Sequence, residues 1–416
     1  MKAISLCVLG LRTSKIDLVK NAIGLLALLV LFYSCKDKNE QKGTANSAVS
    51  AYPAATSTLS PAELRHYKTV ANNFFDSMLG QGNFNGSVLV AKSGEIIYEQ
   101  YKGFRNPRIR KDSITPSTSF HLASISKTIT AMAILKLAED GKLNIEDSVS
   151  KYLTGFPCHG VTIKTLLNHR SGLPNYVHYM EKLGWDKKRL ISNQDVLDFI
   201  IARHEDIDIG APDRRFSYSN TNYALLALVI EKASGQFYGD YLRQTFFEPL
   251  GMKNTYVFTP ADSAISLPSF FYSGRPYPFD FLDLVYGDKN IYSTVRDLLK
   301  WDQALHSGLL FRKETLDAAY SGYSFERPGV NNYGLGWRMF LLRNGKKFIY
   351  HNGWWHGNRT AFYRLLDENV TIIALSNNDS KKVYSSKKLA DMFGNYFKNK
   401  EDARETENTG GGSPAP

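Results

Sequence analysis

The 416-residue sequence contains only three cysteines, Cys7, Cys35 and Cys158. Three are too few for a disulfide framework or for a zinc site built from several closely spaced thiolates. The 51 Lys and Arg residues exceed the 40 Asp and Glu residues but form no long basic run, so we expect no nucleic-acid partner. A content of 43% hydrophobic and 22% charged residues is typical of a globular chain with a sizeable core.

The sequence also lacks an apolar run of the length that spans a membrane, about 20 residues. Its N-terminal run, residues 22–33, follows Lys20 and ends at Ser34-Cys35. This arrangement predicts a signal peptide over residues 1–34, and Ser34-Cys35 resembles a lipobox in which Cys35 would be lipidated. A plain secretory signal and a weak anchor helix are the alternatives. The formal charge of +11 suits the anionic surface of a cell envelope.

Polar segments flank the expected globular part. Residues 35–59 are rich in Ala, Ser and Thr without an apolar period, which predicts a flexible tether of roughly 27 Å. Residues 401–416 carry no core-forming side chain and are expected to be disordered. We therefore expect a lipid-anchored protein of the cell envelope, facing the periplasm, with its folded domain over residues 60–400.

Strand patterns occur at the two ends of the folded part, and helical patterns occur between them. The periodicity predicts a helix from Ser60, a hairpin over 87–101, a buried helix over 124–138, a mostly helical region over about 142–330, four strands between 337 and 377, and a helix near 387–397. This order predicts an α+β domain in which a helical subdomain interrupts the sheet.

Ser124 and Lys127 begin the buried helix, where neither a hydroxyl nor an ammonium belongs without a partner. Positions i and i+3 share a helix face, so the amine can reach the serine hydroxyl. An amine held out of water releases its proton more readily and could accept the serine proton, while a helix N-terminus favours an oxyanion. The pattern alone is weak, because Ser148–Lys151 and Ser385–Lys388 also match it. A helix cap beside a lysine that extends to solvent is the alternative.

Two further short motifs could complete such a site. Tyr218 and Asn220 precede a helix, and the phenol could relay a proton while the carboxamide orients a substrate amide. His351 and Gly353 end a strand, where glycine lets a substrate approach the backbone and the N–H of Trp354 could stabilise an oxyanion. A helix cap at Asn220 and a wall residue at Tyr218 are the structural alternatives.

In this order, Ser-x-x-Lys, Tyr-x-Asn and His-x-Gly resemble the motifs of the serine β-lactamase and penicillin-binding protein superfamily, in particular its class C β-lactamase-like branch. The resemblance runs from about Phe84 to Asn399 and includes the segments 162–174, 249–252, 292–297 and 333–337. It implies an α+β fold with a five-stranded antiparallel sheet flanked by helices, an all-α subdomain, and an active site between the two. No metal or organic cofactor is implied.

The resemblance also implies a role for each motif residue. Ser124 would be acylated, and Lys127 and Tyr218 would share the role of base. Asn220 would orient the substrate, and the backbone N–H groups of Ser124 and Trp354 would form the oxyanion hole.

Several residues bear on the choice of substrate or on the shape of the site. His351 stands where many β-lactamases have lysine, and a neutral imidazole anchors a carboxylate less firmly, although Arg359 could compensate. The aromatic segment 270–281 and the pair Trp354-Trp355 could line the acyl pocket, with packing of an inserted loop as the alternative for the former. His169 is expected to brace a loop.

These observations favour a cell-envelope serine hydrolase that forms an acyl-enzyme with an amide or ester. D-amino-acid peptides, such as a peptidoglycan stem peptide, rank slightly ahead of simple esters. A carboxylesterase and a class C-like β-lactamase are the alternatives within the family. A penicillin-binding or peptidoglycan-sensing module without turnover is the alternative of another class.

Overall fold

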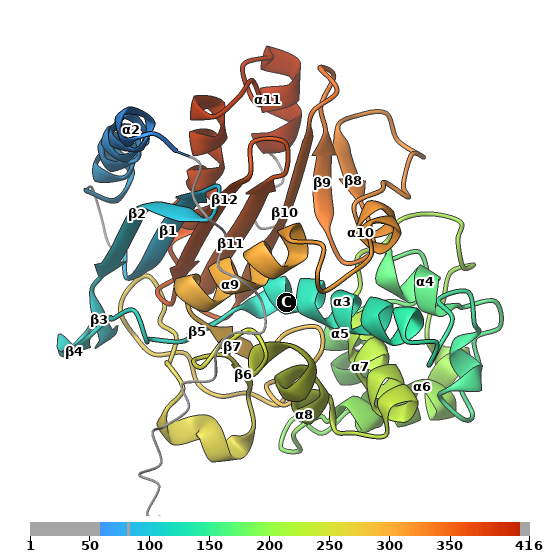
Figure 1. The fold of residues 1–416 in the computed structure, drawn as a ribbon. Helices are drawn as coiled ribbons and strands as arrows, with labels where there is room; N and C mark the ends of the chain where they lie inside the picture. Colours follow the sequence, from blue (N-terminus) through green and yellow to red (C-terminus); the bar gives the residue numbers. More distant parts are fainter. Residues whose placement is uncertain (1–58, 81–83, 408–416) are drawn as a thin grey trace, which may run out of the picture. The chain divides into compact units, whose positions relative to one another are not determined.

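The computed structural model describes residues 59–80 and 84–407 (Figure 1). The expected signal peptide, nearly all of the expected tether and the expected lipidation site, Cys35, lie outside these residues. Within the described residues, no helix is both long and apolar enough to cross a membrane.

A seven-stranded antiparallel sheet joins the two ends of the folded part, in the order β2-β1-β12-β11-β10-β9-β8 (Figure 1). Its strands are β1 (Gly86–Lys92), β2 (Glu95–Lys102), β8 (Asn331–Tyr333), β9 (Arg338–Leu341), β10 (Lys347–Trp355), β11 (Asn358–Leu365) and β12 (Val370–Ser376). The early strand β1 pairs with the last strand along its whole length, so that Gly86 lies opposite Ser376. The predicted α+β fold is confirmed, but the expected number of five strands is too low. The short hairpin of β8 and β9 extends the sheet beyond β10.

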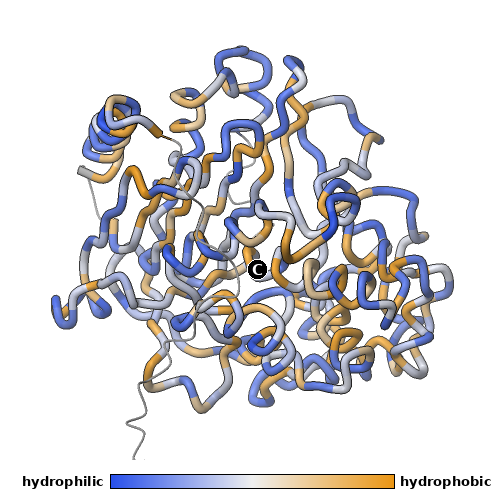
Figure 2. Tube along the Cα trace, viewed as in Figure 1, coloured by the Kyte–Doolittle hydropathy of each residue, from blue (hydrophilic) through white to orange (hydrophobic). Residues whose placement is uncertain are grey.

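Side chains of β1 alternate between two hydrophobic cores, as the period of two requires. Leu89 and Ala91 pack in the core shared with the helical region, whereas Val88 and Val90 pack in the core on the opposite face. The N-terminal helix α2 (Pro61–Gly80) contributes Ala71 and other residues to this second core. Apolar positions, in orange, accordingly recur along the central strands and the neighbouring helices (Figure 2).

Helix α3 (Ser126–Glu139) lies against the sheet and is the central element of the first core (Figure 1). Most of its residues are buried, so it lacks the polar face of a surface helix. A 3-10 turn, Ala123–Ile125, precedes it and contains Ser124, so the predicted buried helix begins two residues later than expected. Helix α7 (Asn220–Ser234) packs directly against α3.

The region 142–330 is mostly helical, as predicted. Its other α-helices are α4 (Ile163–Leu167), α5 (Tyr176–Lys182), α6 (Asn193–Arg203), α8 (Tyr238–Leu242), α9 (Val295–His306) and α10 (Lys313–Ala319). It also contributes β6 (Tyr256–Val257) and β7 (Ile291–Ser293) to a small sheet with β5 (Phe120–His121). A separate hairpin, β3 (Phe104–Asn106) and β4 (Lys111–Ser113), precedes β5.

Two expectations for the C-terminus are wrong. Residues 381–392 form 3-10 turns where an α-helix near 387–397 was expected. Residues 400–407 form helix α11 instead of beginning a disordered tail. This helix has almost no apolar anchor, but Arg343 forms ion pairs with Asp402 and Glu405. The stabilising partner lies almost 60 residues away in the sequence, so composition alone could not reveal it. The rest of the expected tail, residues 408–416, lies outside the described residues.

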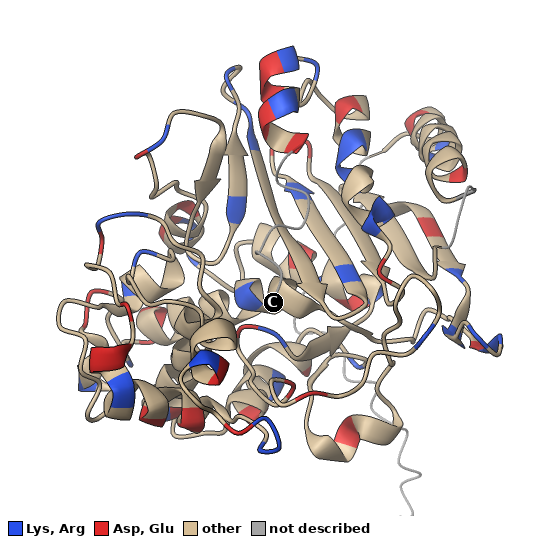
Figure 3. Ribbon diagram, turned by 180° about the vertical axis from the view of Figure 1, so that it is seen from behind, with Lys and Arg blue, Asp and Glu red and all other residues tan. Residues whose placement is uncertain are grey.

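Charged residues lie mostly on the outer helices and loops, where both signs are interspersed (Figure 3). Exceptions include Lys127, Asp288 and Lys289, which are almost fully buried. Because burying a charge is costly without compensating partners, these three residues identify a specialised region of the interior.

Candidate active site

The backbone around Ser124 is held in an unusual conformation. Ala123 has a φ of +50°, a left-handed value that is uncommon outside glycine. Its N–H donates to Nδ1 of His121 over 3.0 Å, and Nε2 of His121 lies 2.9 Å from Oδ1 of Asn290. These bonds fix the 3-10 turn that holds Ser124 just before α3, on the wall of a cavity.

Lys127 is fully buried one helical turn after Ser124. Its Nζ donates to the Ser124 hydroxyl over 3.1 Å and to the backbone carbonyl of Asp288 over 2.7 Å. The adjacent Gly287 lies against the backbone of Tyr223 on α7, where a Cβ would come within 2.4 Å of a carbonyl oxygen. The absence of a side chain at Gly287 therefore lets the 287–288 segment approach the amine. The predicted contact between serine and lysine is present.

Tyr218 and Asn220 reach the same region from the segment that leads into α7. The Lys127 amine lies 5.2 Å from the centroid of the Tyr218 ring, and the Tyr218 hydroxyl is buried without a hydrogen-bond partner. Asn220 lines the same cavity as Ser124. It is the first residue of α7, whereas Ser219 occupies the cap position, so Asn220 is not the helix cap. Both side chains remain free to act on a substrate.

His169 fastens this segment in place. Its backbone carbonyl accepts from the Ser217 N–H over 2.8 Å, and its Nδ1 accepts from the Ser219 N–H and from the Asn222 carboxamide over 3.3 and 3.0 Å. Burial, together with the charge of Lys127, lowers the pKa of His169 well below its usual range. The neutral His169 thus binds the residue before Tyr218 and the residue after it. This is the geometry expected of a residue that braces a loop.

His351 lies on β10 and is fully buried. Its Nδ1 lies 2.7 Å from the carbonyl oxygen of Asn352, which can only accept, so Nδ1 carries the proton and Nε2 accepts from the Tyr333 hydroxyl over 3.2 Å. Burial lowers the pKa of His351 well below its usual range, and the charges of Arg338 and Lys127 lower it further. The imidazole is therefore neutral and has no surface to offer a substrate carboxylate.

Gly353 lets β10 pass directly beside the turn that carries Ser124. A Cβ at this position would lie 2.4 Å from the Leu122 carbonyl oxygen and 3.0 Å from the Ala123 Cβ. Trp354, the next residue, lines the same cavity as Ser124, so the two residues expected to supply the oxyanion hole lie on one cavity wall. The glycine of the third motif thus brings two distant backbone segments together.

Arg359 does not serve as a spare carboxylate anchor. Its guanidinium donates to Asp379 over 2.6 Å and lies 4.2 Å from the Trp354 ring centroid. Arg359 is 6% exposed, and its guanidinium is already paired with Asp379 inside the protein. The expectation that Arg359 compensates for the histidine in the third motif is wrong.

The two other Ser-x-x-Lys matches lack this environment. Lys151 is exposed and paired with Asp147 over 2.8 Å, instead of contacting Ser148. Ser385 and Lys388 line an open groove beside α2, far in sequence from the other motifs. Burial of the lysine therefore distinguishes the motif at Ser124 from the two other Ser-x-x-Lys matches, in which the lysine is exposed.

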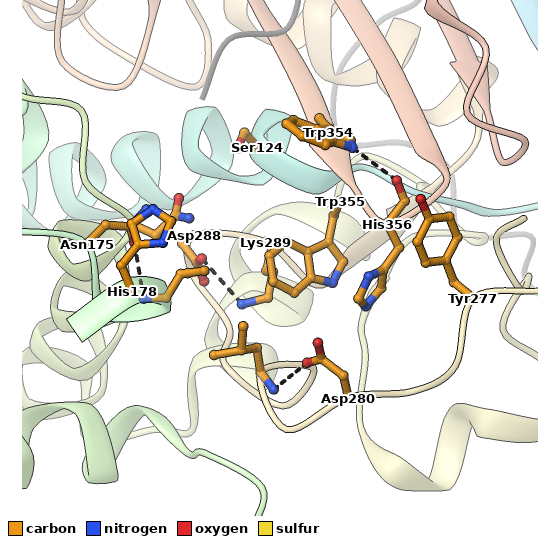
Figure 4. A pocket seen from close by; sticks show the side chains of 13 residues that line it. Ser124, Asn175, His178, Tyr277, Asp280, Asp288, Lys289, Trp354, Trp355 and His356 are labelled. Carbon is orange, nitrogen blue, oxygen red and sulfur yellow. Dashed lines mark hydrogen bonds and ion pairs between the residues drawn. The ribbon is translucent and has the colours of Figure 1, made fainter. Parts of the chain in front are cut away.

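A cavity of about 130 Å³ adjoins Ser124, and several of its lining residues were not anticipated from the sequence (Figure 4). The complete lining is Ser124, Asn175, Val177, His178, Asn220, Tyr277, Asp280, Leu282, Asp288, Lys289, Trp354, Trp355 and His356. Tyr277 and Asp280 come from the aromatic segment, which confirms that this segment contributes to the wall. Asp288 and Lys289 form an adjacent pair of opposite charges in the sequence, and burial of both is visible only in the structure.

Lys289 is held by aromatic and acidic neighbours. Its amine lies 4.5 Å from the Trp355 ring centroid and 3.4 Å from Oδ2 of Asp288, and it donates to the Tyr176 hydroxyl. Burial lowers the pKa of Lys289, and Lys127 lowers it further, while Asp288 and Asp283 oppose the shift. Two buried amines therefore lie close to the same cavity.

A second cavity, of about 620 Å³, has Arg338 on its wall. The Arg338 guanidinium lies 4.7 Å from the Tyr218 ring centroid, so the tyrosine ring has Lys127 and Arg338 as cationic neighbours. Glu326 and Glu405 also line this cavity, but each is paired with an arginine, Arg170 and Arg343 respectively.

Within the described residues, one group could hold a metal ion: Asp280, Asp283 and His356, whose ligand atoms lie within 4.8 Å of one another. Asp283 already accepts hydrogen bonds from the Trp355 indole over 2.7 Å and from the backbone N–H of Asp280 over 2.7 Å. Nε2 of His356 lies 2.9 Å from the same carboxylate. The group is satisfied internally and braces the cavity wall.

Comparison with known proteins agrees with this geometry. A family model described as Beta-lactamase matches residues 71–392. The chain is 33% identical to Penicillin-binding protein 4* of Bacillus subtilis (strain 168) over 340 residues, which cover 77% of this chain and 73% of the relative. A penicillin-binding protein from Bacillus halodurans superposes with a TM-score of 0.66 at 23% identity, covering 79% of this chain and 98% of its own.

A D-amino acid amidase from Ochrobactrum anthropi SV3 shares the fold, with a TM-score of 0.64 at 21% identity and coverage of 83% of this chain and 99% of its own. The family resemblance, the fold and the enzyme class expected from the sequence are confirmed. With a family model that covers well over half of its length, this chain belongs to the β-lactamase family, and it is a serine hydrolase of the class C-like β-lactamase and penicillin-binding protein superfamily.

Proposed function

We propose that the protein cleaves D-amino-acid peptides whose leaving group ends in a free carboxylate. The observation that carries this proposal is Arg338. Its partners among the described residues are tyrosine rings, whereas no carboxylate pairs with it. A guanidinium that lines a cavity without an acidic partner suits a substrate carboxylate, which it can bind through two parallel hydrogen bonds.

The position of Arg338 beside the Tyr218 ring supports binding of that carboxylate on the leaving-group side. In the proposed reaction, the Ser124 hydroxyl attacks the scissile carbonyl and transfers its proton to Lys127. Tyr218 then gives its phenolic proton to the departing amine as the bond between that amine and carbon breaks, and Lys127 returns the proton taken from Ser124 to the phenolate. The departing residue must therefore lie near Tyr218, and the Arg338 guanidinium is beside the same ring.

The acyl-enzyme is resolved by water, with the same groups acting in reverse. Lys127 and Tyr218 deprotonate the water, which adds to the ester carbonyl, and the proton returns to Ser124 as the acid product leaves. The N–H groups of Ser124 and Trp354 stabilise the oxyanion in both steps. The preference for the D configuration is supported by one of the structures described above, a D-amino acid amidase.

A substrate panel tests the proposal. It contains a D-Ala-D-Ala peptide, the same peptide with its terminal carboxylate amidated, a short-chain chromogenic ester and a cephalosporin, with mass spectrometry for an adduct on Ser124. We expect the free-acid peptide to give the highest kcat/KM. Faster hydrolysis of the ester or the cephalosporin would identify an esterase or a β-lactamase. A stable adduct without turnover would identify a binding or sensing module.

We also propose that the protein is held at the cell envelope through a lipid on Cys35. The proposal rests on the apolar run 22–33 and the Ser34-Cys35 pair that follows it. A Cys35→Ser variant is expected to lose metabolic fatty-acid labelling and globomycin-sensitive processing. Labelling that persists in this variant would overturn the proposal.

A further inference from the structure

The cavity beside Ser124 contains a buried carboxylate with one free oxygen. Asp288 is 1% exposed and lines the cavity (Figure 4). Its Oδ2 lies 3.4 Å from the Lys289 amine and accepts from the Tyr176 hydroxyl over 3.2 Å. Its Oδ1 is buried without a hydrogen-bond partner. Leaving such an acceptor unpaired is costly, so the oxygen calls for a donor that enters the cavity.

The carboxamide oxygen of Asn220 is a second buried acceptor without a partner, and Asn220 is another residue of the cavity wall. A carboxylate can only accept hydrogen bonds, and a carboxamide oxygen likewise only accepts. The group that satisfies both must therefore carry several N–H or O–H donors. A primary ammonium has three donors and a positive charge, which also compensates the carboxylate.

The charged residues nearby do not supply a hydrogen-bond donor to Oδ1 of Asp288. Lys289 is directed at Oδ2 of Asp288 and at the Tyr176 hydroxyl, while Lys127 contacts the carbonyl oxygen of Asp288 instead of its carboxylate. Asp280, a second carboxylate on the cavity wall, adds negative charge. Oδ1 is therefore the oxygen of the Asp288 carboxylate that has no donor, whereas Lys289 is paired with Oδ2.

In the proposed reaction, the cavity beside Ser124 lies on the acyl side of the scissile bond. The departing amine takes its proton near Tyr218, on the side of the Arg338 cavity, as derived above. The acyl part must then extend from Ser124 toward Asn220 and Asp288. The cavity has a volume of about 130 Å³, close to the roughly 150 Å³ of an engineered protein cavity that accepts benzene. The space therefore suits a group of about the size of one side chain.

We propose that Asp288, together with Asn220, forms a subsite for a primary ammonium group on the acyl part of the substrate. The inference builds on the proposed function, because it names the chemistry of the acyl residue in the same reaction. The ammonium can come from the free α-amino group of an N-terminal residue or from an amine-bearing side chain. Asp288 is then a residue that determines specificity and leaves the chemical step to Ser124, Lys127 and Tyr218.

Equilibrium binding to a Ser124→Ala variant tests the subsite without any need for turnover. Calorimetry compares D-alaninamide with N-acetyl-D-alaninamide, and N-acetyl-D-lysinamide with N-acetyl-D-norleucinamide. We expect the ammonium-bearing member of at least one pair to bind about 10- to 100-fold more tightly, as for a hydrogen bond between charged groups. The first pair reports an α-ammonium, and the second reports a side-chain ammonium. Equal binding within both pairs overturns the proposal.

Substitution of Asp288 assigns the preference to this residue. In the Ser124→Ala background, Asp288→Asn is expected to reduce the preference to less than about 3-fold while keeping the thermal melting temperature close to that of its parent. Asp280→Asn removes a charge from the same cavity wall and is expected to keep most of the preference. An equal loss in both variants would show a general effect of charge and overturn the assignment.

The two proposals can fail separately. If the wild-type enzyme turns over none of the peptides in the substrate panel, the proposed function fails, whereas an ammonium preference that depends on Asp288 still establishes the subsite. If Asp288→Asn does not fold, the comparison in the Ser124→Ala protein alone still decides whether an ammonium is preferred. The same amide pairs, followed by hydrolysis in the wild-type enzyme, show whether the preference extends to kcat/KM.

Discussion

The Tyr333 hydroxyl donates to Nε2 of His351 across 3.2 Å, while burial and the charges of Arg338 and Lys127 lower the pKa of this imidazole and keep it neutral. A lysine at this position would place an ammonium beside the charges of Arg338 and Lys127, both of which act on His351. The histidine thus preserves the local charge balance and the position of the tyrosines around the base.

His351→Lys is therefore expected to lower kcat/KM by about 10- to 1,000-fold for every substrate alike. The measurement compares a substrate that ends in a carboxylate with its methyl ester. A selective gain on the acid would contradict the neutral role of His351. His351→Gln, which keeps hydrogen-bonding capacity without a charge, is the matched control and is expected to lose less activity.

Ser124→Ala is expected to abolish turnover, with a loss of about 10³-fold or more in kcat, while the protein stays folded. Ser148→Ala is the matched control, because Ser148 and Lys151 repeat the motif on the surface. Initial rates and circular dichroism are measured for both variants. Undiminished activity in the Ser124 variant would exclude this serine as the nucleophile.

Arg338→Gln is expected to lower kcat/KM by about 10- to 100-fold on a peptide with a free terminal carboxylate, since a charged hydrogen-bond donor is lost. The same peptide with an amidated end should change by less than about 3-fold. Arg327→Gln, which removes an exposed charge from the same cavity, serves as the control. Equal losses on the acid and the amide would show that Arg338 supports Tyr218 and does not bind the substrate.

Acidification is expected to destabilise the protein through His121. Burial lowers the pKa of His121 to about 4, whereas the unfolded chain titrates near 6.5. Between these values the unfolded state binds the extra proton, so the free energy of unfolding falls as the pH falls, by about 3 kcal/mol in total for this group. Urea unfolding at pH 7, 5.5 and 4 measures the effect. His121→Asn should show a shallower pH dependence, whereas the exposed His306→Asn should follow the wild type.

The arrangement of the candidate site was largely predictable, because each motif carries its own chemistry. Ser124, Lys127, Tyr218, Asn220 and Trp354 were each chosen for a group that the reaction needs, and the fold brings those groups to one region. The function of His351 was not decided by the sequence, because its environment depends on Arg338 and Tyr333, which come from other strands of the sheet.

The residues that we propose to define substrate preference were less predictable. Asp288 and Arg338 have no fixed spacing to the motifs. Asp288 was singled out because one carboxylate oxygen lacks a hydrogen-bond donor, and Arg338 because its neighbour is a tyrosine ring and no carboxylate pairs with it. Helix α11 escaped prediction for a related reason, since its stability depends on Arg343. Sequence patterns report local periodicity and recurring chemistry, whereas unmatched charges become visible only when the neighbours of a side chain are known.

The pairing of β1 with β12 has a consequence for biosynthesis. Strand β1 leaves the ribosome almost 300 residues before the strand that covers its edge, so its unpaired backbone groups stay available to other chains until synthesis is nearly complete. Such long-range pairing slows folding and exposes intermediates to aggregation. Because β10, with Gly353, is also made late, a chain that ends before β10 lacks the strand that packs beside the Ser124 turn, and we expect that its Ser124 is not acylated.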